Sequence, residues 1–245
     1  MRTFASLGRY VGNQLYRYAF PIYRPLYSTF KSYADRTERG LLRHHLLPGS
    51  IVVDAGANIG IYSAFLSQCV SPTGQVHSFE PDQQNFTRMQ AALGHIPVVR
   101  LNQLALSDKT GEATLYVSRR LNVDHRIYPV DGEARESVPI RTVRLDDYFK
   151  TGDRIDLIKM DIQGNELHAL RGAERLLREN PRIKLLLELW PYGLRQAGTT
   201  WSDLITHLQD RGFTLQEISP AGLSPLPPDS VREGADWYLN VFASR

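Results

Sequence analysis

The chain has 245 residues, of which 42% are hydrophobic and 22% are charged, as in ordinary globular proteins. These values exclude a mainly disordered chain, and no apolar run approaches the ~18 residues of a membrane-spanning helix. The single cysteine, Cys69, excludes an internal disulfide framework and a cysteine-based zinc cluster. The first residues also lack the continuous apolar core of a secretory signal. We therefore expect a cytoplasmic protein without an integral membrane segment.

Positive charge and aromatic residues are concentrated in residues 1–47, here called the head. The head carries a net charge of +6, whereas residues 48–245 are slightly acidic at −3. Its aromatic residues recur at the spacing of one helical face, at Tyr16, Phe20, Tyr23, Tyr27 and Phe30. A one-sided aromatic face has to be buried. We therefore expect a helical extension that acts as a lid over the site or as a contact in a homodimer.

The predicted elements fall into two regimes. Two or three short helices are expected over residues 3–47, interrupted by Pro21, Pro25 and Pro48. From residue 50 onward, apolar runs typical of strands alternate with segments typical of helices. The expected strands cover residues 51–53, 75–79, 98–101, 155–160, 183–189, 213–218 and 237–243. The expected helices cover residues 59–68, 82–93, 165–179 and 201–211, with Asp82 and Thr200 as N-caps.

Two further segments complete the pattern. A strand-rich insertion runs from about residue 104 to residue 143, and the proline-rich segment 220–234 is expected to be a loop. The repeated strand–helix units indicate an α/β domain over residues 48–245. We expect a seven-stranded, mostly parallel sheet with helices on both faces. Ligands of such sheets bind beyond the carboxyl ends of the strands. The residues that end the predicted strands are therefore informative: Asp54, Glu80, Asp161 and Glu188.

A glycine-bearing turn at residues 54–60 joins the first predicted strand to the first helix of the domain. Glu80 follows Gly60 by 20 residues, at the end of the next strand, where a carboxylate can accept both hydroxyls of a ribose. Asn58 stands in place of the glycine that lets the backbone approach a pyrophosphate, and Asp54 would repel a pyrophosphate. The turn therefore argues against an NAD-dependent oxidoreductase. It favours a cationic ligand that contains ribose, such as S-adenosylmethionine.

The chain resembles the FkbM family of S-adenosylmethionine-dependent methyltransferases. The matching segments occur in family order across about residues 50–195, at residues 53–60, 79–81, 105–108, 158–166 and 188–191. The resemblance implies the class I methyltransferase fold, which is Rossmann-like. It places four residues around the methionine end of the cofactor: Asp54, Gly56, Asn58 and Gly60. It places Glu80 on the ribose and a further four residues by the adenine: Ala105, Leu106, Ser107 and Asp108.

Gln163 stands where the family commonly has a glutamate, so we assign no chemical role to this position. The head lies outside the resemblance.

Two residues are candidates for the removal of a proton from the methyl acceptor. Asp161 ends an apolar strand and could act as the base, orient the acceptor, or bind a divalent metal with a partner. His125 lies in the insertion, and an imidazole titrates near neutrality. Asp124 beside it could raise its basicity. No residue is assigned as a metal ligand, and a divalent metal at the site stays open.

The expected activity is methyl transfer from S-adenosylmethionine to an oxygen of a small molecule, sugar or natural product. One alternative is N-methylation of a peptide or another amide or amine acceptor. A second alternative is a module that binds S-adenosylmethionine or acts as a scaffold, without catalysis. The acidic body and the absence of an RNA-binding module in the sequence argue against a nucleic-acid partner.

Overall fold

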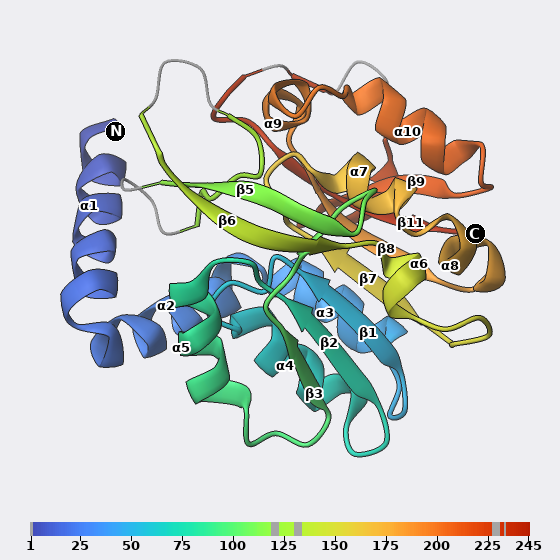
Figure 1. Cartoon of the computed structure of the whole chain (residues 1–245), viewed down its shortest axis with the longest axis horizontal. Helices are drawn as coiled ribbons and strands as arrows, with labels where there is room; N and C mark the ends of the chain where they lie inside the picture. Colours follow the sequence, from blue (N-terminus) through green and yellow to red (C-terminus); the bar gives the residue numbers. More distant parts are fainter. Residues whose placement is uncertain (1, 119–122, 130–133, 227–230, 233) are drawn as a thin grey trace.

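The main sheet of the molecule matches the predicted architecture, with one strand more than expected. The computed structural model describes residues 2–118, 123–129, 134–226, 231–232 and 234–245, with only the backbone at residues 2–7 and 9. Among them, eight strands form one sheet (Figure 1) in the order β10 (Gly222–Pro225), β9 (Thr214–Ser219), β11 (Leu239–Ser244), β8 (Lys184–Leu189), β7 (Leu157–Met160), β1 (Ile51–Ala55), β2 (Gln75–Phe79) and β3 (Val99–Asn102). The neighbouring strands β3, β2, β1, β7 and β8 pair in parallel. The pairs β8–β11, β11–β9 and β9–β10 are antiparallel.

Helices cover both faces of this sheet, as predicted. Successive strand residues point to opposite faces, so Val52 joins one apolar cluster and Val53 the other, and both are fully buried. The Val52 side packs against α3 (Arg36–His45), α4 (Ile61–Val70) and α5 (Gln83–Leu93). The Val53 side packs against α6 (Leu145–Tyr148), α7 (Glu166–Arg171), α8 (Glu174–Glu179), α9 (Pro191–Gln196) and α10 (Trp201–Gln209).

The expectation of a loop over residues 220–234 is wrong at its start. Residues 222–225 form β10, which pairs with β9 in an antiparallel hairpin. The turn before β10 reaches Gly222 at a φ of +111°, a conformation open to glycine. Leu223 then packs on the rim of the apolar cluster. Pro225 is tolerated because β10 is an edge strand. The sheet therefore has eight strands rather than seven.

The predicted helix over residues 165–179 is two helices, α7 and α8. A side-chain carbon at Gly172, between them, would lie 2.1 Å from the carbonyl oxygen of Ser107. The chain therefore turns where the two segments approach closely. The predicted N-caps are confirmed: the Asp82 carboxylate accepts a hydrogen bond from the Asn85 N–H at 2.8 Å, and Thr200 forms a capping box with Asp203.

The insertion forms a second, three-stranded sheet. Its order is β4 (Ala105–Leu106), β6 (Glu136–Val143) and β5 (Gly111–Val117). The loop between β5 and β6 reaches the carboxyl ends of the main strands, because residues 123–127 line the same cavity as those ends. The insertion therefore forms one wall of the candidate site.

The head forms α1 (Arg2–Tyr18), α2 (Phe20–Ala34) and α3, which lie along one flank of the sheet (Figure 1). Pro25 lies inside α2 rather than interrupting it. The lost backbone hydrogen bond costs little there, since Pro25 is exposed and water can reach the freed carbonyl. Among the described residues, no helix is both long and apolar enough to cross a bilayer.

The aromatic stripe of the head packs mostly against the start of α4. Tyr16 and Tyr23 are buried in a cluster with Ile59 and Ile61. Consecutive rings of the stripe contact one another along its length, from Tyr16 to Phe30. Phe30 departs from the expectation, because 62% of its surface is exposed.

Candidate functional site

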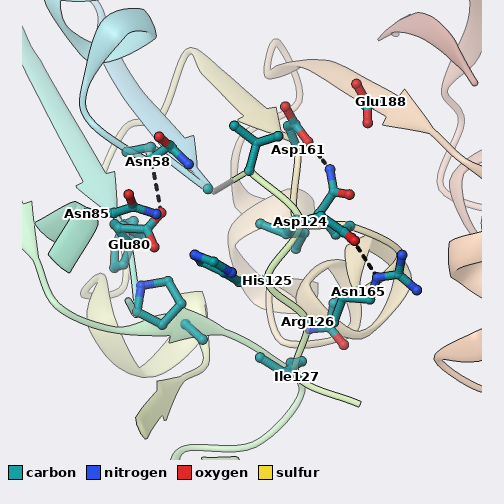
Figure 2. A pocket seen from close by; sticks show the side chains of 18 of the residues that line it. Asn58, Glu80, Asn85, Asp124, His125, Arg126, Ile127, Asp161, Asn165 and Glu188 are labelled. Atoms are coloured by element: carbon teal, nitrogen blue, oxygen red, sulfur yellow. Dashed lines mark hydrogen bonds and ion pairs between the residues drawn. The ribbon is translucent and has the colours of Figure 1, made fainter. Parts of the chain in front are cut away.

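A cavity of about 640 Å³ opens at the carboxyl ends of β2, β1, β7 and β8. Its walls come from these strand ends, the loop between β5 and β6, and α2. This is the edge at which open parallel sheets bind ligands. Figure 2 shows Asn58 and Glu80 on one side of the cavity, and Asp161 and Glu188 on the other.

The cavity brings together seven of the eleven predicted site residues. They are Gly56, Asn58, Glu80, Ala105, Leu106, His125 and Asp161. The other four do not line it: Asp54, Gly60, Ser107 and Asp108.

The turn after β1 is shaped by left-handed backbone conformations. Gly56 has a φ of +75°, and a side-chain carbon there would lie 2.0 Å from the carbonyl oxygen of Asp161. Only glycine fits this approach. Asn58 has a φ of +51°, which asparagine tolerates better than most residues, and its side-chain oxygen accepts the N–H of Ile59. The turn therefore runs close to the segment after β7, and residues 56–59 of the turn line the cavity.

Glu80 is held in place by the backbone of two neighbouring segments. Its carboxylate accepts the N–H of Asn58 at 2.8 Å and the N–H of Asp82 at 2.9 Å (Figure 2). Burial raises the pKa of Glu80 to about 7, although these two N–H groups oppose the shift. The Asn85 side chain also hydrogen bonds the carboxylate, so about one of its four lone-pair sites is left for a ligand hydroxyl. The geometry fits a group that receives a hydrogen bond from a ribose.

Asp54 lies beneath the cavity rather than in its wall. Its carboxylate is fully buried, accepts the hydroxyl of Ser63 at 2.7 Å, and lies 3.4 Å from the ammonium of Lys159. Burial alone would lower the pKa of Lys159, but Asp54, Asp161 and Glu188 raise it overall. The Lys159 ammonium therefore stays charged, and Lys159 lines the cavity where Asp54 does not.

Gly60 serves the packing of helices. It has a φ of +81° and precedes α4, where a side-chain carbon would lie 2.6 Å from Leu93 of α5. Gly60 therefore lets the start of α4 pack closely against α5.

Only the first half of the segment predicted to lie by the adenine, residues 105–108, lines the cavity. Ala105 and Leu106 line the cavity, and the Leu106 carbonyl accepts the side-chain amide of Asn165 at 2.9 Å. Ser107 and Asp108 turn toward α7, where the Asp108 carboxylate lies 3.3 Å from Nδ1 of His168. The apolar pair is thus the part of this segment that can contact a base.

Burial outweighs Asp82 and Asp124, which raise the pKa of His125. Asp124 is held by two arginines, at 2.7 Å from Arg126 and 2.6 Å from Arg135. The Nδ1 atom of His125 accepts the backbone N–H of Ser118 at 3.2 Å. Because a backbone N–H can only donate, the neutral imidazole carries its proton on Nε2. Burial lowers the pKa of His125, so the neutral form prevails at pH 7.

The His125 ring lies nearer to Glu80 than to the carboxylates at the ends of β7 and β8 (Figure 2). In Figure 2 its ring extends from the insertion toward the Glu80 side of the cavity, away from Asp161 and Glu188. Asp82, next to the Glu80 segment, is the acid with the strongest influence on the imidazole. His125 is therefore placed as a hydrogen-bond donor beside the nucleoside half of the cavity.

Asp161 lies at the end of β7, as predicted, and lines the half of the cavity away from Glu80 (Figure 2). One of its oxygens accepts the side-chain amide of Gln163 at 2.9 Å, which leaves the second oxygen for a ligand. Gln163 itself has a φ of +56°, and its carbonyl accepts the hydroxyl of Tyr128. Gln163 thus acts on the position of Asp161 through a side-chain amide, where the family commonly has a carboxylate.

Several residues that shape the site had no role assigned from the sequence. Lys31 of α2, Lys159 and Tyr238 line the cavity, together with Tyr27 of the aromatic stripe. The sequence could have pointed to Lys159, because a charged residue inside an otherwise apolar strand needs a buried partner. Nothing in the sequence pointed to Tyr238. No cluster of three or more histidine, cysteine or acidic side chains suited to a metal ion occurs among the described residues.

The residues present fit S-adenosylmethionine in its nucleoside half. A buried carboxylate faces the cavity at the end of β2, two apolar residues face it at β4, and the glycine turn lies between β1 and α4. These are the groups that a ribose, an adenine and an aminoacyl chain require.

Comparison with known proteins identifies the family. The model of the FkbM methyltransferase domain matches residues 54–215. The 31-O-demethyl-FK506 methyltransferase FkbM of Streptomyces tacrolimicus is 28% identical over 212 residues, which cover 73% of this chain and 79% of that protein. The 2-O-methyltransferase NoeI of Sinorhizobium fredii is 27% identical over 147 residues, which cover 53% of this chain and 60% of that protein.

Solved structures show the same fold. A Streptococcus mutans protein in complex with SAH (S-adenosylhomocysteine) aligns with a TM-score of 0.51 at 13% identity, over 85% of this chain and 96% of that chain. An rRNA methylase from Streptococcus thermophilus aligns with a TM-score of 0.50 at 16% identity, over 85% of this chain and 93% of that chain. The class I methyltransferase fold is therefore confirmed. Together with the family match, it shows that this chain belongs to the FkbM methyltransferase domain family and is an S-adenosylmethionine-dependent methyltransferase.

Proposed function

We propose that the protein methylates a hydroxyl oxygen of a small molecule, either a natural product or a sugar. The observation that carries this proposal is the division of one cavity into a nucleoside half at Glu80 and a carboxylate half at Asp161. The names of two relatives, a 31-O-demethyl-FK506 methyltransferase and a 2-O-methyltransferase, describe transfer to oxygen and support it. A neutral hydroxyl also needs a proton acceptor, which carboxylates can provide.

The residues that would hold S-adenosylmethionine follow from the geometry. Glu80 would accept a ribose hydroxyl, Ala105 and Leu106 would contact the adenine, and the backbone of residues 56–58 would face the aminoacyl chain. Asp54 would act there indirectly, by keeping Lys159 charged. When bound, the cofactor supplies a methyl group on a positively charged sulfur. The protein then has mainly to align the acceptor oxygen with that carbon.

Two residues have proposed roles around the acceptor and the cofactor. Asp161 orients the acceptor through its free oxygen, since the other is taken by Gln163. His125 donates a hydrogen bond from Nε2 rather than removing a proton, because its Nδ1 already accepts the Ser118 N–H. This assignment replaces the base role that the sequence suggested for His125.

The head is proposed to close the acceptor half. Tyr27 and Lys31, on the inner face of α2, line the cavity. A second copy of the chain would have to bind the outer face, where Ile22, Leu26 and Phe30 are more than half exposed. The lid and a homodimer contact therefore use opposite faces of the same helix and do not compete.

Product analysis tests the proposal. The full chain is incubated with methyl-labelled S-adenosylmethionine and a panel of sugars, hydroxylated natural products, amines and short peptides, and the products are analysed by mass spectrometry. We expect label on an oxygen of a sugar or natural product. Label found on nitrogen, or on a peptide, would refute O-methylation and support the alternative that the sequence left open.

A further inference from the structure

Resting on the proposed function, we propose that Glu188 is the catalytic base, which removes the proton from the acceptor hydroxyl during methyl transfer. Glu188 lies at the carboxyl end of β8 and lines the cavity. Because β8 pairs with β7, Glu188 is next to the end of β7, where Asp161 lies. The neighbouring strand β11 places Asn240 opposite Glu188 in register. A base at this position faces the carboxylate half of the cavity, on the side away from Glu80 (Figure 2).

The state of the other carboxylates in the cavity wall supports this choice. Both oxygens of Glu80 accept backbone N–H groups, and Asp124 is held by two arginines. Asp161 accepts the Gln163 amide, and Asp236 is exposed at the rim. Glu188 is half-buried and has no hydrogen bond or ion pair with any described residue. Its oxygens are therefore open to an acceptor hydroxyl, whereas those of the other buried carboxylates are wholly or partly engaged.

Strand order gives a second argument. The strands run β2, β1, β7 and β8 across this edge of the sheet. A ribose on Glu80 at β2 and an aminoacyl chain over the turn after β1 leave the ends of β7 and β8 for the acceptor. His125 extends toward the Glu80 side, so it is badly placed to reach a proton on an acceptor over β8. Glu188 lies on the acceptor side by topology.

The surroundings suit a base that works near neutral pH. Burial raises the pKa of Glu188 well above its ordinary value, and Asp161 and Glu166 raise it further. Lys159 at the end of β7 and Lys31 of α2 oppose the shift. Tyr27 of α2 and Tyr238 before β11 also face this group. A carboxylate with an ordinary pKa is a weak base, so a raised pKa improves proton transfer.

Methyl transfer with Glu188 as the base forms one bond, breaks one bond and moves one proton. The acceptor oxygen forms a bond to the methyl carbon while the bond between that carbon and sulfur breaks. The electron pair of the broken bond stays on sulfur, which becomes a neutral thioether. The hydroxyl proton moves to a carboxylate oxygen of Glu188, and solvent later removes it. No oxidant, reductant or further reactant is required.

The test compares wild type, Glu188→Gln and Glu188→Asp as full-length chains. The acceptor is the hydroxylated compound that the wild type methylates fastest in the product panel. We expect Glu188→Gln to lower kcat by roughly 10²–10⁴-fold and Glu188→Asp to recover part of it. The wild-type kcat should rise with pH and then level off, and Glu188→Gln should lose this rise. Glu217→Gln, a half-buried glutamate on β9 outside the cavity, serves as the matched control.

A second readout separates catalysis from binding and folding. Calorimetry with SAH should give the same affinity for Glu188→Gln and wild type, because Glu80 and not Glu188 holds the nucleoside. Carboxyl-carbon NMR of the free protein should show a glutamate signal, besides those of Glu80 and Glu166, that titrates well above the ordinary range and is missing in Glu188→Gln.

Three results would overturn the assignment of Glu188. They are near-normal turnover by Glu188→Gln, a loss of SAH affinity in that variant, or loss of the pH-dependent rise in Asp161→Asn instead. The absence of any methylated hydroxyl product with wild type would refute the proposed function itself.

Discussion

Two buried glutamates near the cavity, Glu80 and Glu166, differ in what surrounds their carboxylates. Glu80 and Glu166 are both buried, and burial raises the pKa of each to about 7. Glu80 faces the cavity, whereas Glu166 does not line it and accepts the N–H groups of Ile162 and Gly164 in the turn after β7. The same residue type therefore lines the cavity in one place and shapes a turn in the other.

The raised pKa of Glu80 predicts how SAH affinity depends on pH. Ribose hydroxyls donate to an ionised carboxylate, and the ionised form is lost as the pH falls through about 7. Affinity should therefore rise with pH, by up to about tenfold per unit below the pKa, and level off above it. Calorimetry from acidic to mildly basic pH measures this. Glu80→Gln should flatten the curve, and an unchanged pH dependence in that variant would show that another group is responsible.

Sequence alone located the residues whose roles depend on spacing along the chain. Glu80 could be found because a ribose-binding acid follows the glycine turn by a fixed distance. The partners of His125 and Asp54 could not be found, because Ser118 and Lys159 meet them only after the sheet and the insertion have formed. Glu188 was visible as a strand end, but its lack of hydrogen bonds is a property of the folded chain.

At the scale of elements, the turn after β1 and the turn after β7 depend on each other. Gly56→Ala would place a side-chain carbon 2.0 Å from the Asp161 carbonyl, at a φ of +75°. Gly198→Ala is a matched control, since Gly198 has a φ of +80° but nothing within 4 Å of the added carbon. We expect Gly198→Ala to cost roughly 1–2 kcal/mol, the cost of a left-handed non-glycine residue. Gly56→Ala should cost more and also weaken SAH binding.

Thermal unfolding and SAH titration of both variants check this. Equal loss of stability in the two variants would show that the Asp161 segment moves aside without cost.

Long, regular elements were predictable, and short ones were not. The strands β1, β2, β3, β7, β8, β9 and β11 and the caps Asp82 and Thr200 followed from apolar runs and capping residues. The four-residue helix α6 and the hairpin strand β10 are too short for a periodic signal. The break between α7 and α8 depends on the Ser107 carbonyl, which comes from a distant segment.

At the scale of the whole molecule, all three helices of the head pack on the body, and one face of α2 lines the cavity. Tyr27→Ala should open the acceptor half and raise the KM for the acceptor, while SAH affinity stays near that of wild type. Tyr33→Ala is the control, because Tyr33 lies on the same helix but is 70% exposed and does not line the cavity. Steady-state kinetics with the best acceptor of the panel measures both. Equal KM values in wild type and Tyr27→Ala would reduce the head to a packing element.

Calorimetric titration with SAH shows whether this cavity holds S-adenosylmethionine through Glu80. Wild type should bind SAH and should not bind NAD. Glu80→Ala should weaken SAH binding by roughly 1.5–3 kcal/mol, the range for hydrogen bonds to a charged group, or roughly 10- to 150-fold in Kd. An affinity unchanged by Glu80→Ala, or binding of NAD without binding of SAH, would contradict the account.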